Sequence, residues 1–280
     1  MASRTCDPAR RAVRTDVHRC HGVRRHRSSS RRRPKARRRR SNRWWRSGGA
    51  AGERRTVSGQ HRHPIFARLY ARLSGAAEAK GVAEHRAEML SGLEGRVVEV
   101  GAGNGLNFAH YPSTVTEVIA VEPEPHLRKL ARLAADEATV DVTVVDGTAD
   151  SLPLEDGSCD AAVCSLVLCS VTDQAGALAE VRRVLRPGGE LRFYEHVLAD
   201  SRRFAMVQRA VDLVHPHVAG GCHVTRDTER AIAAADFEIT SIRRFRFAPD
   251  LLSTQAAPKI LGAARLVRES TVPAMPPSDG

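Results

Sequence analysis

The sequence contains no run of about 18 apolar residues, the minimum for a transmembrane helix. Its first residues also lack the apolar central region of a signal peptide. None of its six cysteines forms a C-x-x-C pair, so the commonest spacing of metal ligands and redox disulfides is absent. We therefore expect no membrane span, no bound metal and a reducing, cytoplasmic environment. We expect burial as small apolar side chains for the four cysteines beyond the first 60 residues, Cys159, Cys164, Cys169 and Cys222.

Positive charge is concentrated in the first 60 residues. Residues 1–60 hold 20 basic and 3 acidic side chains, whereas residues 61–280 hold 24 basic and 29 acidic side chains. The arginine-rich segment 24–46 has no apolar periodicity, so we expect a disordered tail. Such a tail could bind nucleic acid, with Trp44 and Trp45 stacking on bases, or an anionic membrane surface. A third interpretation gives it no function and places the true start of the protein further along the chain.

The segment 97–105, VVEVGAGNG, predicts a strand that runs into a glycine-rich turn. Three glycines at alternate positions allow a backbone to approach a ligand closely. The dinucleotide pattern G-x-G-x-x-G is excluded because Leu106 stands where a small residue is required. Glu99, just before the turn, suits a ligand with an ammonium or sulfonium group. We expect a helix from about Asn104, whose free N–H groups face that ligand.

Further apolar runs alternate with segments of helical spacing, which predicts an α/β fold with a doubly wound, mostly parallel sheet. Such sheets bind ligands at the carboxyl ends of their strands. Glu122 follows the run 118–121 and lies 21 residues after Gly101, where an acid can accept hydrogen bonds from ribose hydroxyls. S-adenosylmethionine carries both a sulfonium and a ribose. The polar residues predicted at this one edge are Glu99, Glu122, Asp146 and Ser165.

Four segments together resemble the class I S-adenosylmethionine-dependent methyltransferases: VVEVGAGNG, VIAVEPEP, VVDGTADSLPLEDGSCDAAVCSLVLCSV and EVRRVLRPGGELRFYEH. More narrowly, segments 164–171, 194–197 and 221–226 resemble the methyltransferase-like alkyl-thiol S-methyltransferases of animal microsomes. The resemblance covers residues 61–265. Those animal enzymes begin with a hydrophobic membrane anchor, where this sequence has its arginine-rich tail, so membrane attachment is not carried over.

The resemblance implies a Rossmann-like sheet of seven strands, the last antiparallel, in a domain at residues 61–266. A flexible, proline-containing tail is expected at 267–280, and S-adenosyl-L-methionine is the implied cofactor. The implied cofactor-binding residues are Glu99, Gly101, Ala102, Gly103, Asn104 and Gly105 around the methionine part, Glu122 and Pro123 at the ribose and adenine, Asp146, Gly147 and Thr148 at the adenine edge, and Ser165 and Leu166 as the floor.

Methyl transfer from a sulfonium requires no fixed catalytic triad, but a thiol acceptor benefits from a base. His196, after the fifth predicted strand, is the candidate base, and a hydrogen-bonded structural histidine is the alternative. His215, His217 and His223 lack a fourth ligand at metal spacing and indicate a pocket wall or loop surface. An amphipathic helix around residues 65–73 is expected to pack on the core and supply pocket residues. The candidate acceptor-pocket residues are Phe66, Tyr70, Asn107, Cys169, His217 and His223.

The sequence thus predicts an S-adenosylmethionine-dependent methyltransferase that acts on a small molecule, with an alkyl thiol as one candidate. The mildly acidic region after residue 60 favours this class. A nucleic-acid methyltransferase or binding protein guided by the basic tail is the alternative, although the N/D-P-P-Y/F motif of base methylation is absent after the fourth predicted strand. A lipid or quinone acceptor and a non-enzymatic cofactor-binding domain also remain open.

Overall fold

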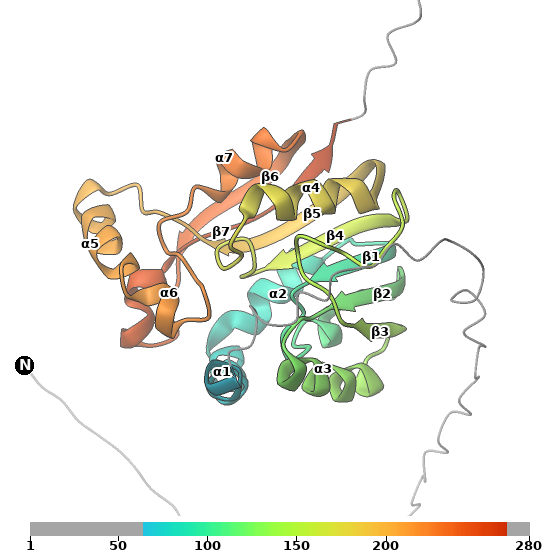
Figure 1. Cartoon of the computed structure of the whole chain (residues 1–280), viewed down its shortest axis with the longest axis horizontal. Coiled ribbons are helices and arrows are strands. Elements are labelled where there is room, and N and C mark those ends of the chain that lie inside the picture. The colour runs from blue at the N-terminus through green and yellow to red at the C-terminus, as the bar shows by residue number, and fades with distance from the viewer. Residues whose placement is uncertain (1–63, 268–280) are drawn as a thin grey trace, which may run out of the picture. The chain divides into compact units, whose positions relative to one another are not determined.

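The computed structural model describes residues 64–267, so the predictions for the tail at 1–60 and for residues 268–280 lie outside the described residues. A seven-stranded sheet with the order β3-β2-β1-β4-β5-β7-β6 forms its centre (Figure 1). The strands are β1 (Gly95–Val100), β2 (Val115–Val121), β3 (Val142–Val145), β4 (Cys159–Ser165), β5 (Leu185–His196), β6 (Phe237–Arg246) and β7 (Pro258–Leu266).

Strands β1 to β5 pair in parallel, and β7 runs antiparallel between β5 and β6. The predicted seven strands with a final antiparallel strand are therefore confirmed. Because parallel strands point the same way, the ends of β1, β2, β3 and β4 meet at one edge. The antiparallel pairing places Lys259 of β7 opposite His196 at the end of β5.

Helices cover both faces of the sheet, with α4 (Gln174–Val184) and α7 (Thr228–Ala234) on one face and α3 (Pro125–Glu137) on the other (Figure 1). Alternate residues of each buried strand enter the two cores: Val98 packs with α4, whereas Val97 packs with Met89 of α2. No helix within residues 64–267 has the length and apolarity needed to cross a membrane. The α-helices are α1 (Pro64–Ala77), α2 (Ala83–Leu90), α3 (Pro125–Glu137), α4 (Gln174–Val184), α5 (Arg202–Asp212), α6 (His215–Val218) and α7 (Thr228–Ala234).

Helix α4 has a side-chain cap at its start and is followed directly by a strand. Asp173 caps it, because its carboxylate accepts a hydrogen bond from the Gly176 N–H at 2.9 Å. The helix ends at Val184, and β5 begins at once at Leu185. The segment Pro187–Gly188 therefore lies within β5, which continues to His196.

The predicted helix from Asn104 is wrong. Gly105 has a φ of +83°, which an α-helix does not accept, and its N–H donates to Ala102 O in a turn. A short 3₁₀ turn, η3 (Phe108–His110), follows instead. The glycine-rich segment is consequently a compact loop that caps the end of β1.

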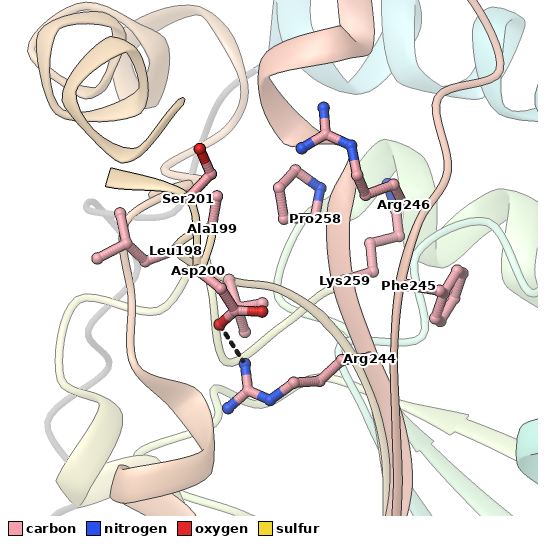
Figure 2. A pocket seen from close by; sticks show the side chains of 10 residues that line it. Leu198, Ala199, Asp200, Ser201, Arg244, Phe245, Arg246, Pro258 and Lys259 are labelled. Carbon is pink, nitrogen blue, oxygen red and sulfur yellow. Dashed lines mark ion pairs between the residues drawn. The ribbon is translucent and has the colours of Figure 1, made fainter. Parts of the chain in front are cut away.

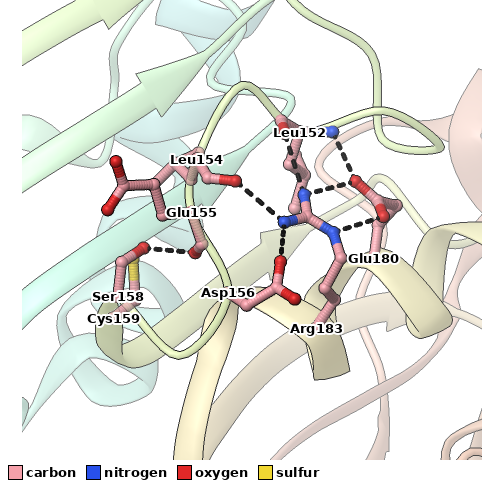
Figure 3. A network of polar contacts seen from close by, with 8 residues as sticks. All are labelled: Leu152, Leu154, Glu155, Asp156, Ser158, Cys159, Glu180 and Arg183. Carbon is pink, nitrogen blue, oxygen red and sulfur yellow. Dashed lines mark hydrogen bonds and ion pairs between the residues drawn. The ribbon is translucent and has the colours of Figure 1, made fainter. Parts of the chain in front are cut away.

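A polar network anchors the loop between β3 and β4 to α4 (Figure 3). The Arg183 guanidinium donates to the carbonyl oxygens of Leu152 and Leu154 and to the carboxylates of Asp156 and Glu180, at 2.7–3.0 Å. Glu180 also accepts the Leu152 N–H at 2.8 Å. The half-buried side chain of Arg183 thus fixes the conformation of the LPLEDGS segment, which borders the edge of the sheet.

Candidate functional site

A cavity of about 390 Å³ lies at the carboxyl edge of the sheet, in the size range of small-molecule sites. Three loops that follow β2, β3 and β4 supply most of its wall, and the rest comes from Gly101 after β1, helix α1 and the segment after α6. The lining residues are Phe66, Gly101, Val121, Glu122, Pro123, Glu124, Leu127, Gly147, Thr148, Ala149, Asp150, Leu166, Val167, Ser170, Val171, Thr172, Asp173, Gly220 and Gly221.

Gly101 is the residue of the glycine-rich loop that lines this cavity. It has a φ of +65°, and a Cβ at this position would lie 2.7 Å from Cγ2 of Val167. A side chain at residue 101 would therefore be both strained and crowded. Glycine here keeps the end of β1 open to a ligand.

Glu122 lies at the end of β2, where it joins the glycine-rich loop to the start of α3. Its Oε2 accepts the Gly103 N–H at 2.7 Å, and its Oε1 accepts the Glu124 N–H at 2.8 Å. Burial raises the pKa of Glu122 to about 7. Each carboxylate oxygen keeps a further lone pair, so Glu122 can still accept hydrogen bonds from a ligand.

Helix α1 covers the loop from outside. The rings of Phe66 and Tyr70 stack with centroids 5.7 Å apart, and Phe66 reaches the cavity. Side chains at Gly220 would clash with Phe66, so the segment after α6 meets α1 closely. The expected packing of the whole apolar face is wrong, because Leu69 and Leu73 are 50% and 59% exposed.

The floor of the cavity is the turn after β4, which Glu195 of β5 holds in place. Its buried carboxylate accepts the N–H groups of Val167, Leu168 and Cys169 at 2.9–3.0 Å. Burial holds the pKa of Glu195 well above its usual range. The turn begins at Leu166, which has a φ of +59°. This role of Glu195 was not identified from the sequence.

Comparisons of the sequence and of the fold both match this chain to methyltransferases. Residues 98–193 match the methyltransferase domain family. Human thiol S-methyltransferase TMT1B is 39% identical over 181 residues, covering 62% of this chain and 73% of the relative. Human thiol S-methyltransferase TMT1A is 37% identical over 145 residues, covering 50% of this chain and 59% of the relative.

Solved methyltransferases share the fold. A Thermotoga maritima enzyme described as a possible histamine N-methyltransferase has a TM-score of 0.56 at 23% identity, over 72% of this chain and 97% of its own. A geranyl diphosphate methyltransferase in complex with S-adenosylmethionine has a TM-score of 0.54 at 18% identity, over 72% of this chain and 90% of its own. The chain belongs to the S-adenosylmethionine-dependent methyltransferases, in the family of TMT1B.

Six of the residues expected to bind the cofactor line the cavity of this methyltransferase, and the others contact protein atoms instead. Asn104, for example, donates to the Ser74 hydroxyl of α1 at 3.1 Å. Those that line it are Gly101, Glu122, Pro123, Gly147, Thr148 and Leu166. Those outside it are Glu99, Ala102, Gly103, Asn104, Gly105, Asp146 and Ser165.

Glu99 is buried below the loop, away from the cavity. Its two oxygens accept from Asn107 Nδ2 and Tyr111 OH, both at 2.8 Å, and burial raises its pKa to about 7. Asn107 Oδ1 in turn accepts from Arg86 at 2.8 Å. The prediction of Asn107 as an acceptor-pocket residue is wrong, because the turns of the loop direct its side chain inward.

Arg86 was missed by sequence reasoning. This buried residue of α2 donates to Glu78 at 2.8 Å and to the Ser165 hydroxyl at 3.2 Å, besides its bond to Asn107. It thereby connects α2, the glycine-rich loop and the end of β4. The available signal was a charged residue at helical spacing from Met89 and Leu90.

Asp146 faces solvent rather than the cavity. Its side chain is 71% exposed, and it accepts a hydrogen bond from Arg128 of α3 at 2.8 Å. The next residues, Gly147 and Thr148, do line the cavity. The loop after β3 therefore reaches the cavity one residue beyond the predicted carboxylate.

Two histidines that were predicted to line the acceptor pocket lie away from the cavity. His217 is exposed on α6, and His223 pairs through Nδ1 with Asp212 at 2.9 Å. Both belong to the surface of the segment that follows α5. The prediction of these residues as pocket walls is wrong, and the flanking Gly220 and Gly221 line the cavity instead.

His196 and Cys169 contact each other behind the cavity wall. His196 Nδ1 lies 3.5 Å from Cys169 Sγ and 3.3 Å from Cys222 Sγ. Burial lowers the pKa of His196, so the imidazole is neutral at pH 7. All four cysteines of the described region are free and buried, as the sequence predicted.

A second hollow, of about 230 Å³, lies beside the end of β5, and Figure 2 shows Arg244 directed at Asp200 across it. Its cationic side chains already have partners. Arg246 stacks on the Phe204 ring at 4.3 Å, and Lys259 donates to two backbone carbonyl oxygens at 2.7 Å. The first cavity is therefore the better candidate for a ligand.

Proposed function

We propose that this methyltransferase moves the methyl group of S-adenosylmethionine to a small alkyl thiol. The observation that carries the proposal is one cavity that joins Glu122 and Gly101 to an apolar wall. The thiol is suggested by the names of the relatives TMT1B and TMT1A, since their acceptor class is printed as thiols.

The cavity residues fit the adenosyl and methionine parts of the cofactor. Glu122 would accept hydrogen bonds from the ribose hydroxyls with its remaining lone pairs. Leu127 and the loop backbone at 147–150 would enclose the adenine. Gly101 would let the methionine end approach the end of β1, because glycine has no Cβ in the way. A Cβ added there would also lie 2.7 Å from Cγ2 of Val167.

The acceptor would enter on the side bordered by Phe66, Leu166 and Val167, with Gly220 and Gly221 opposite. Bound S-adenosylmethionine supplies an electrophilic methyl group on a sulfonium. The protein then has to exclude water and hold a thiol sulfur in line with that methyl group, which lowers a barrier by about 7–11 kcal/mol in well-oriented systems. An apolar wall suits a lipophilic thiol better than a charged one.

The general base is a separate question. Only a thiolate attacks well, so a base would help at neutral pH. His196 stays a prediction in this role: it is neutral, as a base must be, but it contacts two cysteines and not the cavity.

The domain bounds 61–266, the cytoplasmic location and the three interpretations of the basic tail also stay predictions.

The test is transfer of a labelled methyl group from S-adenosylmethionine to a panel of alkyl thiols, quinols, lipids and RNA. We expect labelled thioethers from the thiols, and less of them with the Gly101→Ala protein, because the added Cβ would crowd Val167 in the cavity wall. Labelling of RNA alone would contradict the proposal and favour a role for the basic tail. Labelling of quinols or lipids alone would move the acceptor to those classes.

A further inference from the structure

We propose that Cys169, His196 and Cys222 form a three-ligand site for a thiophilic divalent metal ion, with Zn²⁺ as the best match. Methyl transfer does not require such an ion, so the inference goes beyond the proposed function. The three side chains come from different segments: the turn after β4, the end of β5 and the segment after α6. Their Sγ, Nδ1 and Sγ atoms all lie within 4.8 Å of one another.

The distances fit one shared ion. Tetrahedral Zn²⁺ with Zn–S of about 2.3 Å and Zn–N of about 2.0–2.1 Å separates two sulfurs by about 3.8 Å, and a sulfur from a nitrogen by about 3.6 Å. Here the two sulfurs are 3.6 Å apart, and the sulfur–nitrogen distances are 3.5 and 3.3 Å. An ion therefore needs movements of only a few tenths of an ångström. A disulfide, in contrast, needs its sulfurs at about 2.05 Å.

The donor set matches zinc chemistry. Two thiolates and a neutral imidazole balance the charge of a divalent ion, and thiolate ligands select thiophilic metals over Mg²⁺ or Ca²⁺. Among the His, Cys, Asp and Glu side chains of residues 64–267, no fourth joins this cluster. Three protein ligands with a fourth position open to water are the pattern of catalytic rather than closed structural zinc sites.

Hydrogen bonds to the backbone fix the ligands before any metal binds. The Cys169 N–H donates to Glu195 at 3.0 Å, and its carbonyl oxygen accepts the His223 N–H at 2.8 Å. The Cys222 carbonyl oxygen lies 2.8 Å from Nδ1 of His215. Such outer contacts orient metal ligands and reduce the cost of assembling the site.

The ion would join the segment after α6 to the wall of the main cavity. Ser170 follows Cys169 and Gly221 precedes Cys222, and both of these neighbours line that cavity. A Cβ on Gly221 would lie 2.7 Å from the Ser170 carbonyl oxygen, so the two walls touch at this point. Occupancy of the metal site would hold the segment after α6 against the turn after β4.

The test measures metal in the full-length, untagged protein, in a Cys6→Ser/Cys20→Ser background that removes the tail thiols. We expect about one equivalent of zinc by mass spectrometry of the purified protein, or on titration with Zn²⁺. Co²⁺ should bind in its place with the thiolate-to-cobalt charge-transfer absorption of a tetrahedral site with two sulfurs. Cys222→Ala should lose the metal and the absorption, whereas Cys159→Ala, which removes another buried thiol, should keep both.

The titration of the unmutated ligands keeps the test valid even where Cys222→Ala misfolds. Absence of zinc together with no cobalt absorption would overturn the proposal and leave three hydrogen-bonded side chains. A Cys169–Cys222 disulfide in the isolated protein, with no metal, would also overturn it. Neither readout involves methyl transfer, so failure of this inference is distinguishable from failure of the proposed function.

Discussion

Replacement of Glu122 tests the assignment of the cofactor cavity most directly. In the structure its two oxygens accept the N–H groups of Gly103 and Glu124 at 2.7 and 2.8 Å, and it is 5% exposed. Glu122→Ala removes both acceptors and the proposed ribose contact. Glu122→Gln keeps the volume but turns an amide NH₂ toward one of the two N–H donors.

The expected magnitude follows from the bonds lost. A hydrogen bond to a charged group contributes about 1.5–3 kcal/mol, so loss of the ribose contact should weaken cofactor binding tenfold to more than a hundredfold. One buried and one partly buried N–H group without acceptors should also lower the free energy of unfolding by about 2–4 kcal/mol. We expect Glu122→Gln to fall between Glu122→Ala and the unmutated protein in both quantities.

Calorimetric titration with S-adenosylmethionine and its demethylated product measures the affinity, and chemical denaturation measures the stability. Glu117→Ala is the matched control on the same strand, because Glu117 pairs with Arg96 at the surface at 3.0 Å. Such a half-exposed pair contributes about 0–1 kcal/mol. A folded Glu122→Ala protein with unchanged cofactor affinity would refute the ribose assignment.

The pH dependence offers a second readout of the same residue. Burial raises the pKa of Glu122 to about 7, so part of the free protein carries a neutral carboxyl group at pH 6–7. If the ionised form accepts the ribose hydroxyls, cofactor affinity rises from pH 6 to pH 8 and binding at pH 6 releases a proton. Glu122→Gln should abolish that proton release.

Four further predictions follow from the neighbouring contacts. Gly101→Ala should weaken cofactor binding and unfold more easily by about 1–3 kcal/mol than Gly157→Ala, which has a similar φ of +58° but nothing within 4 Å of the added Cβ. Asp146→Asn should leave cofactor affinity within about twofold, measured by calorimetry, since its exposed carboxylate pairs with an arginine. Burial raises the pKa of Glu99 to about 7, so the folded state binds more protons than the unfolded state between pH 4.5 and about 7, and stability falls as pH rises through that window. Glu99→Gln should flatten this decline, by on the order of 3 kcal/mol in denaturation at pH 5 and pH 8. Arg86→Met should lower the free energy of unfolding by about 3–5 kcal/mol, because it leaves buried partners without their cation.

The architecture could be predicted because each strand of the sheet is a local apolar run with its own turn signal. The buried stretches 97–100 of β1, 118–121 of β2 and 161–164 of β4 are covered on both faces, and every residue in them except Glu99 is apolar. Boundaries were less accurate where glycine acts as a turn residue. The positive φ of Gly105 is incompatible with an α-helix, so the helix expected from Asn104 does not form.

The polar residues whose positions could be predicted differ from the others in one respect: their roles do not depend on contacts with residues distant in the chain. Glu122 and the loop at 147–148 line the cavity because the ends of parallel strands place them there, which the strand order alone implies. Asn107 and Asp146 occupy equally suitable positions in the sequence, but their side chains bind Arg86 and Arg128. The competing arginines lie on separate helices, and no local pattern identifies which carboxylate or amide they bind.

The Cys169–His196–Cys222 cluster could not be identified from the sequence for the same reason. Its cysteines are 53 residues apart, and the histidine is separated from them by 27 and 26 residues, so no spacing motif could relate them. What brings them together is the hydrogen bonding of Glu195, which fixes the turn that carries Cys169 directly against the end of β5 that carries His196. A buried carboxylate that accepts three backbone N–H groups thus both forms the cavity floor and positions two of the three proposed ligands. Glu195 is therefore the residue through which the metal site and the methyl-transfer cavity would be coupled.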